Sequence, residues 1–75
     1  MSRYRVHDAG VVEEFPTLRL LEDWLDLHQY VCENNVRLYG MDDVLDSQGE
    51  VMIYLRQDTE DDRDFAAGTI TWVPE

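Results

Sequence analysis

The segment from Thr17 to Glu33 constrains the fold of this chain more than any other stretch. Apolar residues recur along it three and four positions apart, which is the spacing of one helix face. These residues are Leu18, Leu20, Leu21, Trp24, Leu25, Leu27, His28, Val31 and Cys32. Thr17 is typical of an N-cap, and the pair Asn34–Asn35 is typical of a helix end. The sequence therefore predicts one helix over residues 17–33 with a wide buried face.

Short segments in which apolar and polar residues alternate lie on both sides of this helix and predict β-strands. They are residues 4–7, 11–15, 36–39, 50–56 and 69–73, with turns at 8–10 and 46–49 and a bend within 40–46. We predict an α+β fold, ββαβββ or βαβββ, in which one helix packs on one face of a small antiparallel sheet. A chain of 75 residues is expected to form a single domain over residues 1–75. The predicted core comprises Leu21, Trp24, Leu25, Val31, Val51, Ile53, Leu55, Ile70 and Trp72.

One helix can cover only one face of such a sheet. We expect Tyr4, Tyr39, Met52 and Tyr54 to lie on the other face, where they would suit a partner or a homodimer.

The charge of the chain limits its partners. Seventeen acidic residues face six arginines, there is no lysine, and the net charge is −11. Such a field repels nucleic acid and anionic membranes and attracts basic surfaces, so we predict no direct binding to nucleic acid or to membranes. The 44% hydrophobic content nevertheless indicates a folded chain rather than a disordered one.

The stretch "DTEDDRDF" at residues 58–65 has part of the spacing of a calcium loop. Its acids alternate from Asp58 to Asp64, but Arg63 stands where that loop needs glycine and Thr69 where it needs glutamate. His28 and Cys32 are four residues apart on the predicted helix, yet only His7 could join them, whereas structural zinc takes four ligands. We therefore predict no metal and no cofactor, with His28 and Cys32 as core residues.

Catalytic and targeting motifs do not emerge from the sequence. Ser2 and Ser47 are the only serines, and no nucleophile, base and pocket converge, so we predict that the protein is not an enzyme. The N-terminus lacks an apolar signal segment, no stretch reaches membrane-spanning length, and Cys32 has no disulfide partner. The expected location is the cytoplasm, or the host cytoplasm if a phage encodes the chain.

Acidic clusters are the remaining signal. Glu22 and Asp26 are helix neighbours four residues apart, where like charges destabilise a helix and so suggest another role. Carboxylates on a helix and on loops can match phosphate positions in a groove built for DNA. The predicted partner-binding residues are Glu22, Asp23, Asp26, Asp42, Asp43, Asp58, Glu60, Asp61, Asp62 and Asp64.

In size, in its charge of −11 and in the helix entry "FPTLRLLEDWLDL" beside short strands, the chain resembles the phage-encoded anti-CRISPR inhibitors of the DNA-mimic type. The resemblance implies a non-enzymatic inhibitor that binds a DNA-binding subunit of a CRISPR surveillance complex and blocks target DNA. It carries over no functional residue, because these inhibitors share no sequence motif.

Two alternatives fit the same sequence. The chain could be a small structural or regulatory module that binds protein through an exposed aromatic sheet face, with Tyr39, Met52 and Tyr54 in contact. Its acidity could instead reflect solubility or adaptation to high salt, in which case the fold would require molar salt.

Overall fold

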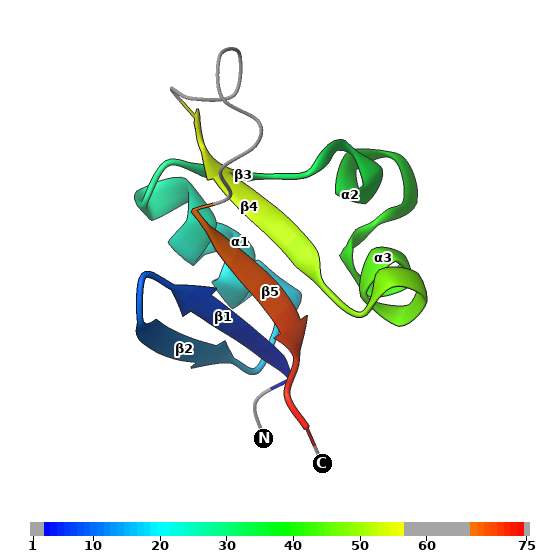
Figure 1. Ribbon diagram of the computed structural model, residues 1–75, viewed down its shortest axis with the longest axis horizontal. Helices are drawn as coiled ribbons and strands as arrows, with labels where there is room; N and C mark the ends of the chain where they lie inside the picture. Colours follow the sequence, from blue (N-terminus) through cyan, green and yellow to red (C-terminus); the bar gives the residue numbers. More distant parts are fainter. Residues whose placement is uncertain (1–2, 57–66, 75) are drawn as a thin grey trace.

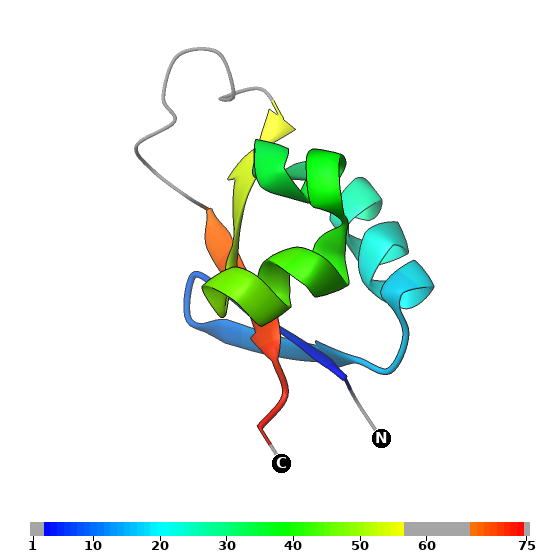
Figure 2. The same cartoon turned by 90° about the vertical axis from the view of Figure 1, so that its right-hand side faces the viewer.

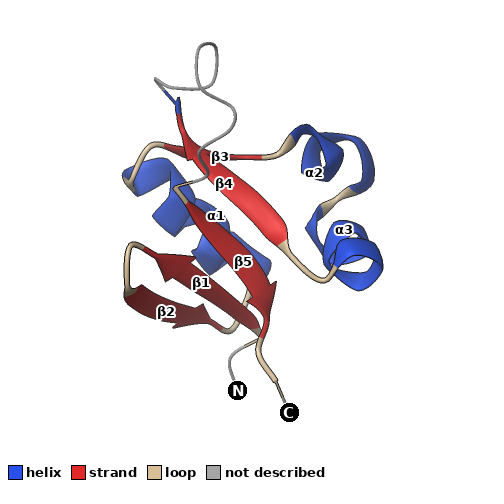
Figure 3. Ribbon diagram, viewed as in Figure 1, coloured by secondary structure: helices blue, strands red, loops and turns tan. Residues whose placement is uncertain are grey.

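The computed structural model describes residues 3–56 and 67–74 (Figures 1 and 3). The strands are β1 (Tyr4–Asp8), β2 (Val11–Phe15), β3 (Tyr30–Cys32), β4 (Val51–Leu55) and β5 (Gly68–Trp72). The helices are α1 (Leu18–Leu27), α2 (Asn34–Tyr39) and α3 (Met41–Gln48). The predicted α+β class is confirmed, but three helices replace the single predicted one.

The five strands form one antiparallel sheet in the order β2-β1-β5-β4-β3. β1 and β2 form the predicted hairpin, in which Tyr4 pairs with Phe15. The predicted strands at 50–56 and 69–73 are also confirmed, within one or two residues. β1 and β5 approach so closely that a Cβ at Gly68 would collide with the carbonyl oxygen of His7, so this position requires glycine.

The helices occupy one side of the sheet. α1 packs against β2 and β3, α3 packs against β4 and β5, and α2 packs against α3. Residues of α1 and α3 share one core with residues of β1, β4 and β5, and Figure 2 shows α1 to the right of the strands with α2 and α3 toward the viewer. We call the opposite side, which no helix of the described chain covers, the outer sheet face.

The core fills the space between the sheet and the helices. Five predicted core residues are buried: Leu21, Leu25, Val51, Ile53 and Ile70. Trp24 and Trp72 are partly buried and pack against this core, whereas Val31 and Leu55 are half-buried and lie outside it, so these two core predictions are wrong. The core also contains Tyr4 and Val6 of β1 and Met41, Val44 and Leu45 of α3, none of which the sequence analysis included.

The predicted helix over 17–33 is wrong in its second half. Thr17 is the N-cap, as predicted, and its hydroxyl accepts a hydrogen bond from the amide of Leu20. The helix ends at His28, and Gln29 takes a positive φ of 59° that breaks the helical path. Tyr30–Cys32 then forms β3, because aromatic and β-branched residues pair well with β4. His28 is exposed, so its predicted place in the core is wrong, whereas Cys32 is half-buried against the core but lies on a strand and not on the helix.

The predicted strand at 36–39 and bend at 40–46 are also wrong. Residues 34–39 form α2, which ends at Gly40 with φ of 92°, and α3 follows directly. α3 buries Met41, Val44 and Leu45, whose spacing is that of one helix face. Gly49, in the left-handed conformation at φ of 84°, ends α3 inside the predicted turn.

The tyrosines predicted for the uncovered face have different positions. Tyr4 pairs with Trp72 on the covered face and is only 1% exposed, so that prediction is wrong. Tyr39 lies on α2, exposed but outside the sheet, so its prediction is wrong as well. Met52 and Tyr54 alternate with the buried Val51 and Ile53 and therefore lie on the outer sheet face, as predicted.

Candidate functional site

Three acids of α1 lie on its exposed side. Glu22, Asp23 and Asp26 are all exposed, because the opposite side of the helix buries Leu21 and Leu25. The guanidinium of Arg56 is 3.8 Å from a carboxylate oxygen of Asp26, an exposed and weak ion pair. Among the described residues, no cation lies within ion-pair distance of Glu22 or Asp23.

The first turn of α3 holds Asp42 and Asp43, where acids stabilise the positive end of a helix. Asp42 accepts a hydrogen bond of 2.7 Å from the hydroxyl of Tyr4 and an ion-paired bond of 3.0 Å from Arg3. Asp42 therefore serves the fold, whereas Asp43 is exposed at the surface.

One acid of α1, Glu22, and one acid of α3, Asp42, both affect Tyr4. Burial, the hydrogen bond to Asp42 and the charge of Asp42 raise the pKa of Tyr4 to about 12, and Glu22 contributes a further increase. Glu22 of α1 and Asp42 of α3 therefore act on one hydroxyl. We call Glu22, Asp23, Asp26, Asp42 and Asp43 the acidic helix surface.

A hollow of about 460 Å³ lies between α1 and the α2–α3 pair. Its walls include Glu22, Asp26 and Glu33, and Cys32 and Met41 also line it. Glu33 supports the fold: its carboxylate accepts hydrogen bonds from the amide of Met52 and from two side-chain amides, those of Asn35 and Gln48. Glu33, which was not among the predicted partner-binding residues, therefore has a structural role.

Burial raises the pKa of the Cys32 thiol to about 11, with smaller contributions from Glu22 and Glu33. Near pH 7.5 the thiolate fraction should be about 100-fold lower than that of an ordinary cysteine, so alkylation should be slower by about that factor. The rate of iodoacetamide labelling, followed by mass spectrometry with free cysteine as reference, measures this. It should rise as pH increases toward 11. Glu33→Gln removes one carboxylate and should increase the rate, and a rate equal to that of free cysteine would contradict the burial of the thiol.

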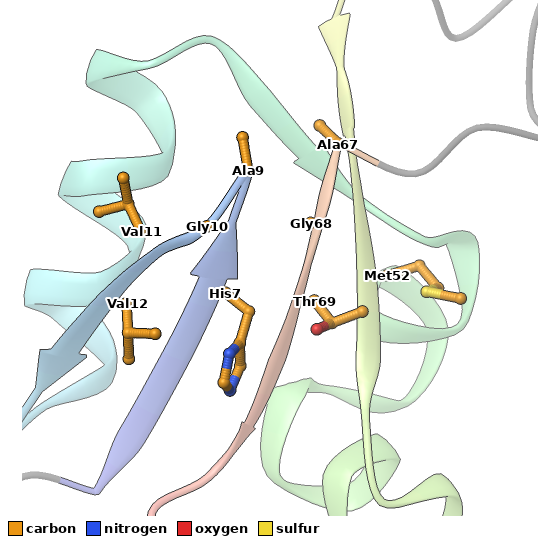
Figure 4. A pocket seen from close by; sticks show the side chains of 9 residues that line it. All are labelled: His7, Ala9, Gly10, Val11, Val12, Met52, Ala67, Gly68 and Thr69. Atoms are coloured by element: carbon orange, nitrogen blue, oxygen red, sulfur yellow. The ribbon is translucent and has the colours of Figure 1, made fainter.

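The outer sheet face differs from the acidic helix surface in its chemistry. Val12, His7, Thr69 and Met52 extend from four neighbouring strands around a hollow of about 260 Å³ (Figure 4). The alternation along β2 puts one acid there, Glu14, and its carboxylate accepts two hydrogen bonds from Arg5. Among the described residues, this face is therefore close to neutral in a strongly acidic protein.

The remaining predicted contacts, Asp58, Glu60, Asp61, Asp62 and Asp64, lie outside the described residues. Within residues 3–56 and 67–74, no three His, Cys, Asp or Glu side chains are grouped so that they could hold a metal ion. In the same part of the chain, no helix is long and apolar enough to cross a membrane.

An exposed apolar stripe on α1 was not predicted. Leu20 and Leu27 were expected on the buried helix face, but they are 48% and 79% exposed. The width of the apolar pattern in the sequence could have indicated this stripe, because it exceeds what the sheet beneath the helix can cover.

The fold and these two surfaces define a small α+β domain with an acidic helical side and a nearly neutral sheet side. A search of protein families, curated proteins and solved structures found no match to the chain.

Proposed function

We propose that this protein is a non-enzymatic inhibitor that presents its acidic helix surface to a basic, nucleic-acid-binding protein surface. The observation that carries the proposal is that Glu22 and Asp26 of α1 line the same hollow as Gly40 and Met41 at the start of α3, the helix whose first turn holds Asp42 and Asp43. Carboxylates placed on two neighbouring helices suit a protein groove in which Arg and Lys side chains are spaced to receive phosphates.

The resemblance to DNA-mimic anti-CRISPR inhibitors names the first partner to test, a DNA-binding subunit of a CRISPR surveillance complex. In this proposal the protein occupies the DNA-binding groove stoichiometrically and excludes the target DNA. No reaction at the carboxylates is required, because occupancy alone blocks the groove.

Competition with DNA tests this function. Purified CRISPR DNA-binding subunits should bind the protein, and duplex DNA should displace it, because both occupy one groove. The dissociation constant, measured by calorimetry, should rise by about 10-fold or more between roughly 50 and 200 mM salt, since surface charge pairs are screened. Binding that DNA does not displace would contradict the mimicry, and so would an affinity independent of salt.

A second candidate function is protein binding through the outer sheet face. Its support is that Met52 and Tyr54 lie on a sheet face that no helix of the described chain covers. Tyr54→Ala should then weaken partner capture more than Asp43→Lys does, whereas the inhibitor proposal expects the opposite order.

A further inference from the structure

The free edge of β2 lies beside the exposed apolar stripe of α1. β2 is the last strand of the sheet and, among the described residues, pairs only with β1 (Figure 1). All of its residues except Phe15 are exposed, and Val11 and Val12 are each more than half exposed. An unpaired edge of this length is a ready template for another strand.

α1 extends an apolar side toward this edge. The ring centroids of Trp24 and Phe15, the last residue of β2, lie 5.7 Å apart. Leu20 and Leu27 lie four residues before and three residues after Trp24, so they share its side of the helix. The helix therefore presents more apolar surface beside the β2 edge than the five strands cover. We call Leu20, Trp24 and Leu27 the α1 stripe.

Negative charge at the β2 edge limits which partners can bind there. The register of β1 with β2 pairs Glu13 with the buried Val6, so Glu13 lies on the covered side of the sheet, between Val11 and Phe15. Among the described residues, no cation is within ion-pair distance of Glu13. Arg19 lies one turn before Asp23 on α1, so a cation stands near that acid on the helix. The preference for a basic occupant therefore rests mainly on Glu13 and on the net charge of −11.

A second copy of the chain is disfavoured at this edge. In the antiparallel register that pairs all five residues of two β2 strands, Glu13 faces Glu13, and like charges directly opposite destabilise a strand pair. Two chains of charge −11 also repel each other at long range.

We propose that the β2 edge and the α1 stripe bind an extended segment of a partner protein, which adds a sixth strand to the sheet. The segment carries an Arg or Lys opposite Glu13, flanked on the same side by apolar residues that contact Val11 and the α1 stripe. Backbone hydrogen bonds to β2 supply affinity, and the alternating side chains supply specificity. This strand-addition proposal rests on the proposed function only in that both proposals require a basic partner.

A designed peptide tests the site directly. It has seven residues, with threonine at the odd positions, valine at the second and sixth, and lysine at the fourth, so that lysine faces Glu13. Its control replaces the lysine with glutamate. In an NMR titration of the isotope-labelled protein, the lysine peptide should shift the backbone amides of β2 and of the α1 stripe. It should bind about tenfold more tightly than the glutamate peptide, because an opposite charge replaces a like charge in one cross-strand pair.

A charge swap makes the test specific. Glu13→Lys should reverse the preference, so that the glutamate peptide binds better, and Asp43→Lys on α3 should leave the preference unchanged. A lysine peptide methylated at its backbone amides should lose binding, since it cannot donate the strand hydrogen bonds. Equal binding of the two peptides, or no binding at low-millimolar concentration, would overturn the proposal. Shifts confined to α3 would also overturn it, while leaving the proposed acidic recognition intact.

Discussion

Tyr4→Ala should remove a large part of the stability of this protein. Tyr4 is 1% exposed, its ring stacks on Trp72 with centroids 5.4 Å apart, and its hydroxyl donates to Asp42. Truncating a buried aromatic side chain costs about 3–5 kcal/mol. A domain of 75 residues has a total free energy of unfolding of about 4–11 kcal/mol at typical values per residue. Urea denaturation followed by circular dichroism should show a free energy of unfolding lower than that of wild type by about 3–5 kcal/mol.

The control is Tyr4→Phe, which keeps the ring stack and removes only the hydroxyl. It should cost about 1 kcal/mol, the usual contribution of one hydrogen bond, because Arg3 still pairs with Asp42. If Tyr4→Ala and Tyr4→Phe cost the same, the packing of the ring would not be the main contribution.

The difference in stability between wild type and Tyr4→Phe should depend on pH, and the raised pKa of Tyr4 gives the sign of that dependence. The pKa of Tyr4 is raised from 10.0 to about 12, so the folded state holds the phenol proton more tightly than the unfolded state does. The stabilisation of the folded state that follows from this tighter proton binding is complete below pH 10 and is lost as the pH rises toward 12. Wild type should therefore lose stability relative to Tyr4→Phe over that interval, which melting curves at several alkaline pH values would show. A difference that stays constant from pH 9 to 12 would contradict the raised pKa.

The hairpin, β4, β5 and the first half of the long helix could be predicted because local pattern and tertiary contacts agree there. In β4, Val51 and Ile53 are buried while Met52 and Tyr54 lie on the outer face, which is the alternation visible in the sequence. α1 similarly buries Leu21 and Leu25 one turn apart.

The second half of the helix could not be predicted from its local pattern. Tyr30–Cys32 continues the apolar spacing of a helix, but the positive φ at Gln29 turns the chain and β4 supplies a strand partner. That partner lies about twenty residues further along the chain, so local periodicity carries no information about it. β3 is a case in which tertiary pairing overrides the helical periodicity of the local sequence.

α3 could have been found from its sequence. Gly40 and Gly49 flank a segment in which Met41, Val44 and Leu45 have helical spacing, and two acids occupy the first turn. The acidic helix surface depends on this missed helix, because Asp42 and Asp43 lie in the first turn of α3, whose start lines one hollow with Glu22 and Asp26 of α1. The sequence could therefore supply candidate acids but not their grouping.

Reversing the charge of Glu22, Asp23 and Asp26 together should weaken binding to a basic DNA-binding partner by about 100-fold at low salt. Replacing all three with lysine changes the net charge from −11 to −5 and places cations where the proposal requires anions. The side chains are exposed and lysine favours helix at least as well as aspartate, so the fold should persist. Calorimetry against the same CRISPR subunits measures the loss, and circular dichroism checks the fold.

The matched control separates a contact surface from a general field. Asp61, Asp62 and Asp64 replaced with lysine give the same net charge of −5 at a different place in the sequence. If α1 is the contact, its triple variant should lose far more affinity than this control. Equal losses would mean that net charge alone attracts the partner, and a larger loss in the control would move the interface to residues 58–64. The comparison therefore decides which carboxylates meet the arginines of a partner, because total charge is held constant.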